Sequence, residues 1–158
     1  MLDRNASKML SEVGIGEGQS VLDFGCGSGT YSIPAAELVG KNGRIHSLDV
    51  SRGALNKLSI KAEKEGLDNI VTLLSSGNVD IPIDNETLNH VLLIDVLQEI
   101  SDKETLLEEI HRILKPEGRM TVYPMHIDAE EVIRMASKTK LRLKGRKFQD
   151  RILVFEKS

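Results

Sequence analysis

The sequence predicts an α/β fold: a Rossmann-like, doubly wound sheet that is mostly parallel and carries an antiparallel C-terminal hairpin strand. Short apolar runs alternate with helical patterns along the chain, as expected when helices cover both faces of a parallel sheet. The first apolar run leads through a loop with three alternating glycines into a helical pattern. The last two strand patterns are separated by a short turn only, which indicates a hairpin.

Five segments have the composition of buried parallel strands. Each is short and apolar and is bounded by turn residues. The second is expected to end at an acidic residue, Asp49. The five segments are Ser20–Phe24, Arg44–Leu48, Ile70–Leu74, His90–Ile94 and Arg119–Tyr123.

Helical patterns lie between these strands. The first is expected from Tyr31 to Val39. Ser51 is a predicted N-cap of the second, and Gly66 is its predicted end. Ser101–Glu104 matches a capping box and leads into an apolar face that reaches Leu114.

The C-terminal third predicts one more helix and the hairpin. Lys115–Gly118 is expected to end the preceding helix and turn into the fifth strand. Asp128 is a predicted helix cap. Lys140–Lys144 and Phe148–Glu156 are the two hairpin strands, with the turn around Gly145–Lys147.

Length and composition narrow the function classes. We expect one domain, 1–158, with a short N-terminal segment (1–17) and no full lid. A net charge of −3 implies no general attraction to nucleic acid or anionic membranes. No apolar run has the length of a membrane span, and no signal peptide is recognisable. The single cysteine excludes a disulfide framework, and we expect a cytoplasmic protein.

The glycine loop predicts a ligand. Gly25, Gly27 and Gly29 follow a strand and precede a helix, so backbone N–H groups and a helix N-terminus face the bound group. Asp49, at the end of the second strand, is placed to accept hydrogen bonds from both hydroxyls of a ribose. Together these features predict an adenosine-type cofactor.

Four segments, in order, resemble the motifs of one family. They are the glycine loop Val21–Gly29, the strand end His46–Asp49, the segment Ile81–Asn89 and the segment Glu109–Gly118. On these residues the chain resembles the class I S-adenosylmethionine-dependent methyltransferases, of the group that includes ubiquinone- and menaquinone-biosynthesis enzymes. The resemblance runs from about Gly18 to the C-terminus.

The resemblance implies S-adenosylmethionine as the cofactor and a set of residues that hold it. Asn78 lies near the position, after the third strand, where the family often has an Asp-Ala pair that holds the adenine. Gln98 lies in the loop after the fourth strand, where the family often has a histidine. Cys26 supplies a small side chain in the loop and is not read as a nucleophile. The implied cofactor-binding residues are Asp23, Gly25, Cys26, Gly27, Gly29, Asp49, Val50, Gly77, Asn78 and Asp95.

Methyl transfer from a sulfonium needs alignment of acceptor, methyl and sulfur, and a base where the acceptor carries a proton. Asp95 and His126 follow the fourth and fifth strands at the ligand edge, so they are the candidate catalytic residues. We expect no metal. A site made of Asp95, His126 and Asp128 is the weighed alternative, supported only by their shared edge.

The predicted function is methyl transfer to a small-molecule acceptor, with a possible homodimer, no DNA partner and no membrane span. A nicotinamide dehydrogenase is disfavoured because the loop lacks the Gly-x-Gly-x-x-Gly spacing. One alternative is a non-catalytic module that binds the cofactor and partners another protein. The other is methylation of a macromolecule through the basic C-terminal hairpin, although charged residues also protect edge strands.

Overall fold

The computed structural model describes residues 5–158, so part of the predicted N-terminal segment 1–17, namely residues 1–4, lies outside the described residues. The chain divides into two compact units, Met1–Gly77 and Asn78–Ser158, and each is described by itself. The single domain 1–158 stays a prediction. No helix among residues 5–158 is long and apolar enough to cross a membrane.

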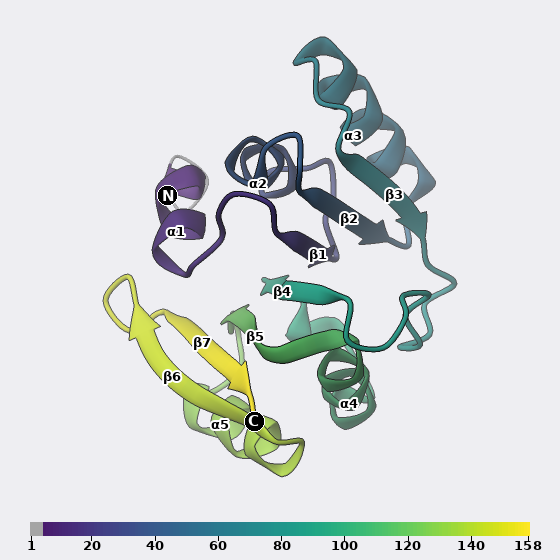
Figure 1. The fold of residues 1–158 in the computed structure, drawn as a ribbon. Coiled ribbons are helices and arrows are strands. Elements are labelled where there is room, and N and C mark those ends of the chain that lie inside the picture. The colour runs from purple at the N-terminus through teal and green to yellow at the C-terminus, as the bar shows by residue number, and fades with distance from the viewer. Residues whose placement is uncertain (1–4) are drawn as a thin grey trace. The chain divides into compact units, whose positions relative to one another are not determined.

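The first unit is a parallel sheet of three strands with helices packed on it (Figure 1). Its strand order is β3-β2-β1, and the register sets Phe24 beside Leu48 and Asp49 beside Leu74. The three strands therefore end at one edge. The elements are α1 (Ala6–Glu12), β1 (Ser20–Phe24), α2 (Ser32–Val39), β2 (Arg44–Asp49), α3 (Arg52–Lys64) and β3 (Ile70–Leu74).

Helix α3 begins and ends where the sequence predicts, whereas α2 begins at Ser32, one residue later than predicted. Ser51 is the N-cap of α3, and its Oγ accepts a hydrogen bond from Ala54 N at 3.1 Å. Gly66 follows the C-cap of α3 with φ 68°, a left-handed conformation that glycine adopts without a Cβ penalty. The apolar side chains of α3, Leu55, Leu58 and Ala62, are buried.

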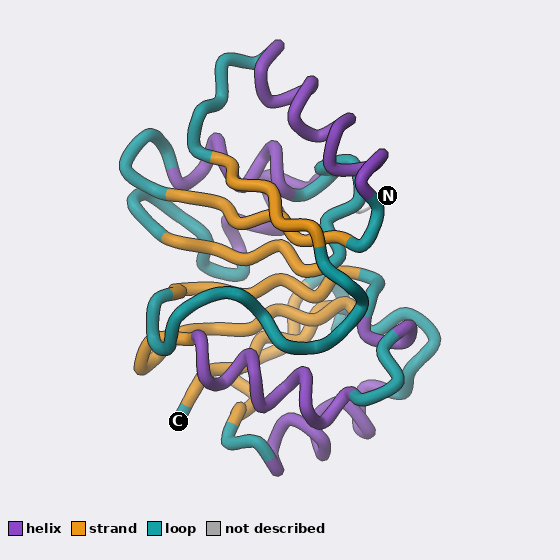
Figure 2. The backbone as a smooth tube through the Cα atoms, turned by 90° about the vertical axis from the view of Figure 1, so that its right-hand side faces the viewer, coloured by secondary structure: helices purple, strands orange, loops and turns teal. Residues whose placement is uncertain are grey.

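The second unit combines parallel and antiparallel pairing. Its strand order is β4-β5-β7-β6, with β4 and β5 parallel and β7 antiparallel to both β5 and β6. Figure 2 shows the strands of each unit layered with helices. The elements are β4 (Leu88–Ile94), a 3₁₀ turn (Leu97–Glu99), α4 (Lys103–Ile113), β5 (Leu114–Tyr123), α5 (Ala129–Lys138), β6 (Leu141–Lys147) and β7 (Ile152–Lys157).

Three predicted boundaries in this unit are wrong. The N-cap of α4 is Asp102, whose Oδ1 accepts from Thr105 N at 3.1 Å, and not Ser101. Leu114 has an extended ψ of 138° and pairs with Leu88, because α4 already ends at Ile113. Residues 115–118 fall within β5, where the pairing with β4 is irregular.

The hairpin is confirmed, but its turn lies later than predicted. Gly145 belongs to β6, at a register shift opposite Val154, rather than to the turn. The chain reverses at Phe148–Asp150, three residues with φ between 51° and 65°. Glycine is the residue that most often adopts this conformation, so the sequence predicts the turn around Gly145, and that prediction is wrong.

Candidate functional site

The glycine loop folds over the end of β2. Gly25 N and Cys26 N both donate hydrogen bonds to Leu48 O, at 2.8 and 3.0 Å. Gly27 N donates to Asp49 Oδ2 at 2.8 Å. The glycine loop, which follows β1, is therefore hydrogen-bonded directly to Asp49, the acidic residue that ends β2. The sequence predicts these two features close together.

Asp49 uses both carboxylate oxygens on the backbone. Oδ2 accepts from Gly27 N, and Oδ1 accepts from Ser51 N at 2.9 Å. A carboxylate has about four lone-pair sites, so each oxygen can accept a further hydrogen bond. The side chain is half-buried, which leaves it accessible to a ligand. Asp49 therefore organises the loop and keeps acceptor sites on both carboxylate oxygens.

The loop glycines share a left-handed backbone, but Gly27 and Gly29 have different surroundings. Gly25, Gly27 and Gly29 all have positive φ, at 76°, 56° and 101°. A Cβ on Gly27 would meet nothing within 4 Å, so the backbone there lies open to a ligand. A Cβ on Gly29 would collide with Leu58 of α3. Gly29 therefore permits close packing of the loop on α3 rather than close approach of a ligand.

Asp23 lies inside the unit and not at its surface. Only 2 % of the residue is exposed, and its Oδ2 accepts from Ser32 Oγ at 2.7 Å. Ser32 Oγ lies 2.7 Å from Ser47 Oγ, so with Asp23 ionised the Ser47 hydroxyl donates to Ser32. Burial raises the pKa of Asp23 to about 6; the bond from Ser32 opposes this and the charge of Asp49 adds to it. This network ties β1, α2 and β2 together beneath the loop.

Cys26 contributes packing. Its side chain is buried in an apolar cluster with Leu55 and Leu58 of α3. Burial, followed by the charges of Asp23 and Asp49, raises the pKa of the thiol far above its ordinary value. A thiol held protonated is a poor nucleophile, which agrees with the interpretation of Cys26 as a loop residue.

Beyond the loop, two predicted cofactor residues of this unit lie near the ends of β2 and β3. Val50 follows Asp49 and is 65 % exposed, an unusual state for a large apolar side chain. Gly77 follows β3 with φ 99° and has no atom within 4 Å of its Cβ position. Asn78, which begins the second unit, is exposed.

The candidate catalytic residues both belong to the second unit. Asp95 directly follows β4, and its N donates to Tyr123 O at the end of β5. Its carboxylate Oδ1 accepts from Gln98 Nε2 at 2.6 Å. His126 lies in the loop after β5 and is exposed. Asp95 and His126 have φ of 56° and 62°, a conformation that non-glycine residues adopt at a cost.

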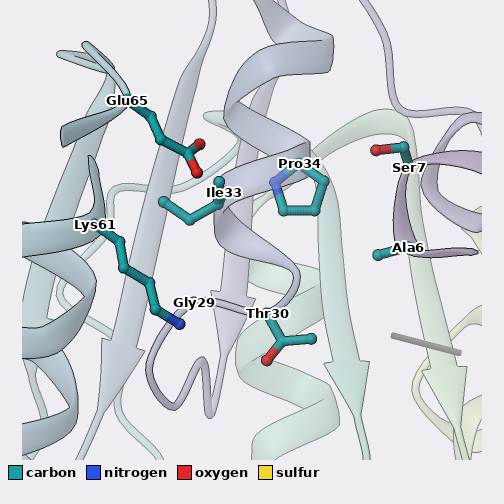
Figure 3. A pocket seen from close by; sticks show the side chains of 8 residues that line it. All are labelled: Ala6, Ser7, Gly29, Thr30, Ile33, Pro34, Lys61 and Glu65. Carbon is teal, nitrogen blue, oxygen red and sulfur yellow. The ribbon is translucent and has the colours of Figure 1, made fainter. Parts of the chain in front are cut away.

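A cavity of about 420 Å³ adjoins the end of the glycine loop (Figure 3). Neither Gly27 nor Asp49 lines it, so it is not formed by the residues that meet at the end of β2. Figure 3 shows Lys61 reaching toward Gly29 and Thr30, and Ile33 lying between Glu65 and Pro34. The residues that line the cavity come from α1, the loop, α2, α3 and the C-cap of α3: Ala6, Ser7, Gly29, Thr30, Ile33, Pro34, Lys61 and Glu65.

A methyltransferase domain model matches residues 15–151, which is most of the chain. The chain belongs to this methyltransferase domain family. The predicted family and the S-adenosylmethionine cofactor of its class are thereby confirmed.

Curated relatives of this methyltransferase domain are demethylmenaquinone methyltransferases. The Oceanobacillus iheyensis protein is 32 % identical over 113 residues, which cover 70 % of this chain and 46 % of that protein. The Bacillus subtilis protein is 31 % identical over 113 residues, which cover 72 % of this chain and 48 % of that protein. The chain spans about half the length of the curated relatives it matches.

Solved structures share the fold. A SAM-dependent methyltransferase from Aquifex aeolicus has a TM-score of 0.84 at 25 % identity and covers 98 % of this chain and 90 % of its own. The [4+2]-cyclase SpnF has a TM-score of 0.78 at 19 % identity and covers 90 % of this chain and 58 % of its own. The predicted α/β, Rossmann-like fold with an antiparallel C-terminal strand is confirmed.

The basic residues of the C-terminal hairpin are partly neutralised in this methyltransferase domain. Arg146 Nη2 lies 2.7 Å from Glu130 Oε1, and Lys144 Nζ lies 3.7 Å from Glu156 Oε1. Arg119 of β5 also faces Glu156, at 3.8 Å. These pairs favour a solvated, charge-protected hairpin over a surface for a macromolecular substrate. Within residues 5–158, no three His, Cys, Asp or Glu side chains are grouped as a metal site would need.

Sequence reasoning missed Ser32 and Ser47. Both are fully buried, and together they carry the hydrogen-bond network of Asp23. A serine in a buried strand and another at the first position of a helix were weak signals, since each fits many surface positions as well. Their spacing from Asp23, 9 and 24 residues along the chain, became meaningful only once β1 and β2 were paired.

Proposed function

We propose that this domain transfers a methyl group from S-adenosylmethionine to a small-molecule acceptor. The observation that carries the proposal is the bond between Gly27 N and Asp49 Oδ2. It brings an open backbone position and a ribose-binding carboxylate together at the edge of a parallel sheet where nucleotides bind. The family match supports the same chemistry.

The residues of the first unit fit the cofactor. Asp49 has lone pairs left for the ribose hydroxyls, and the open space at Gly27 admits the ligand to the backbone. Val50 offers an exposed apolar face for a flat base. Asp23 acts indirectly, because it is buried beneath the loop and holds Ser32 at the start of α2. Gly25 and Cys26 shape the loop through their bonds to Leu48 O.

Of the remaining predicted residues, Gly77 belongs to the first unit, and Asn78, Asp95 and His126 belong to the second. Gly77 leaves room beside the base, and the Asn78 amide contacts the adenine edge. Asp95 binds the amino-acid end of the cofactor or, with His126, removes a proton from the acceptor. The bound cofactor supplies an activated methyl group, so the protein's contribution is to align the acceptor and exclude water.

The relatives' names indicate which acceptor to test first. Demethylmenaquinone, offered in both redox forms with methyl-labelled S-adenosylmethionine, should receive the label if this domain shares its relatives' acceptor. If another small molecule receives the label and demethylmenaquinone does not, the proposed reaction class is retained and that acceptor is excluded.

The decisive variant is Asp49→Ala. It removes the ribose acceptors and the bond to Gly27, so the affinity for adenosylhomocysteine should fall by roughly 2–3 kcal/mol. Asp49→Asn keeps one acceptor oxygen and should fall between Ala and wild type. Asp68→Asn, a change at an exposed aspartate before β3, is the control and should bind normally. Unchanged affinity in a folded Asp49→Ala protein would contradict the proposal.

A non-catalytic cofactor-binding module is the second candidate. It stays an alternative because a fold, such as the one shared with the [4+2]-cyclase SpnF, does not by itself determine the function. Binding of adenosylhomocysteine without methyl transfer to any acceptor would support the module. A homodimer also stays a prediction, which light scattering would test.

A further inference from the structure

The cavity of about 420 Å³ lies within the first unit and has its own lining. Gly27 and Asp49, which meet at the end of β2, do not line it. Of the residues predicted to bind the cofactor it includes only Gly29, which serves the packing of the loop on Leu58. The volume is in the range of small-molecule sites, so the cavity is a second place in this unit where a ligand fits.

Lys61 supplies an unpaired positive charge at one end of the cavity. Figure 3 shows Lys61 of α3 reaching toward Gly29 and Thr30. Among residues 5–158, its ammonium has neither an ion pair nor a hydrogen bond. Thr30 is exposed, so its hydroxyl is open to a ligand as well. An ammonium beside a hydroxyl favours an anionic group such as a carboxylate at this end.

Glu65, the C-cap of α3, supplies negative charge at another point of the cavity. Figure 3 shows its carboxyl group beside Ile33 of α2. Desolvation raises the pKa of Glu37, also on α2, and a hydrogen bond with Glu65 and the charge of Glu65 raise it further. Two carboxylates at this distance repel unless they share a proton or a cation lies beside them. A bound ammonium would take the place of that proton, so this end favours a cation.

Apolar surface lies between the charged groups. Ile33 and Pro34 of α2 are half-buried and line the cavity. Ile33 also packs against the buried cluster of Cys26, Leu55 and Leu58, which fixes this surface to the core of the unit. A hydrocarbon chain that lies on these two side chains would be removed from water, which favours binding.

The spacing of the two charges determines the shape of a suitable ligand. Lys61 and Glu65 are one helical turn apart, so their Cα atoms are separated by about 6 Å along the axis of α3. The two side chains do not form an ion pair with each other, and Figure 3 shows their charged ends directed to different parts of the cavity. A ligand that contacts both must therefore carry its charges at opposite ends of a chain.

We propose that this cavity is a second small-molecule site, which binds a linear zwitterion with its carboxylate at Lys61 and its ammonium at Glu65. The hydroxyl of Thr30 donates to the carboxylate, and Ile33 and Pro34 contact the hydrocarbon chain. An α-amino acid does not fit this pattern, because both of its charges are at one end. The inference goes beyond the proposed function and does not depend on it, since the site lies outside the contact of Gly27 with Asp49.

Titration of the wild-type protein with 6-aminohexanoate, followed by the backbone amide signals in NMR, tests the inference. The signals of Gly29, Thr30, Ile33 and Lys61 should shift with a dissociation constant of about 1–10 mM, because exposed ion pairs are weak. The isomer 2-aminohexanoate carries both charges at one end and is the matched control ligand. It should bind at least about threefold more weakly.

Lys61→Gln and Glu65→Gln should each weaken binding of 6-aminohexanoate by about three- to tenfold. Lys64→Gln and Glu63→Gln are the control variants, since both positions are exposed on α3 and neither lines the cavity. They should bind as wild type does.

Equal binding of the two isomers, or signal shifts confined to residues outside the cavity, would overturn the inference. Both results come from the wild-type protein, so they hold even where a variant does not fold. Wild-type affinity in folded Lys61→Gln and Glu65→Gln would overturn it too. Displacement of 6-aminohexanoate by adenosylhomocysteine would show that the cavity belongs to the cofactor site and is not a second site.

Discussion

At the residue scale, the two carboxylate oxygens of Asp49 hold the glycine loop and the start of α3. Asp49 and the glycine loop were expected at one edge, and Gly27 N does donate to Asp49 Oδ2. What the sequence could not show is that Ser51 N occupies the other oxygen. It could not distinguish Gly27 from Gly29 either, because that difference depends on Leu58, which lies about thirty residues away in the chain.

Alanine at these two glycines should separate binding from stability. Gly27→Ala places a methyl group in open space, so it should cost about 1–2 kcal/mol of backbone strain and weaken adenosylhomocysteine binding at least about tenfold. Gly29→Ala adds a collision with buried Leu58, so it should cost about 1–3 kcal/mol more. Thermal unfolding and calorimetry measure both effects. Normal binding by Gly27→Ala would show that the ligand does not approach this backbone.

At the element scale, strands were predicted more accurately than ends and turns. β1 and β3 have the predicted bounds, because short apolar runs between turn residues define buried strands locally. The cap of α4 was misplaced by one residue, since Ser101 and Asp102 are both good caps and only the geometry of Thr105 decides between them. The hairpin turn was misplaced because its left-handed residues carry no glycine.

The position of the α4 cap is directly testable. Asp102→Ala removes the acceptor of Thr105 N and of Thr105 Oγ1, so it should lower the free energy of unfolding. Ser101→Ala is the matched control and should change it by less than about 0.5 kcal/mol. Urea unfolding of both variants measures the difference. A larger loss in Ser101→Ala than in Asp102→Ala would contradict Asp102 as the N-cap and favour the predicted capping box that starts at Ser101.

At the scale of the whole molecule, the order of motifs was enough to predict fold class and family, because alternating strands and helices leave few topologies. Buried ionisable groups were not predictable, since burial depends on long-range packing. Asp23 of β1 and His90 of β4 are two such groups. His90 Nε2 lies 2.7 Å from Thr121 Oγ1, and burial, aided by the charge of Arg119, lowers the pKa of His90 to about 3.

These two groups should give opposite pH dependences. Asp23 has a pKa of about 6 when folded and about 3.9 when unfolded, so the folded state binds more protons and stability falls as pH rises from 4 to 6. His90 has a pKa of about 3 when folded and about 6.5 when unfolded, so stability falls as pH drops below 6.5.

Substituting each group should therefore remove its contribution to the pH dependence of the unfolding free energy. Relative to wild type, Asp23→Asn should gain about 2 kcal/mol of unfolding free energy as pH rises from 4 to 6.5. His90→Gln should gain about 3 kcal/mol as pH falls from 6.5 to 4. Urea unfolding across this range measures both. Parallel pH curves for wild type and either variant would mean that the group concerned is not buried as described.

We propose above all that the glycine loop over β2 and Asp49 form an S-adenosylmethionine site. Titration calorimetry of the wild-type protein with adenosylhomocysteine and, separately, with NAD tests it most directly. We expect adenosylhomocysteine to bind and, at 100 times its dissociation constant, to stabilise the fold by about 2.7 kcal/mol, while NAD does neither. Binding of NAD without binding of adenosylhomocysteine would contradict the account.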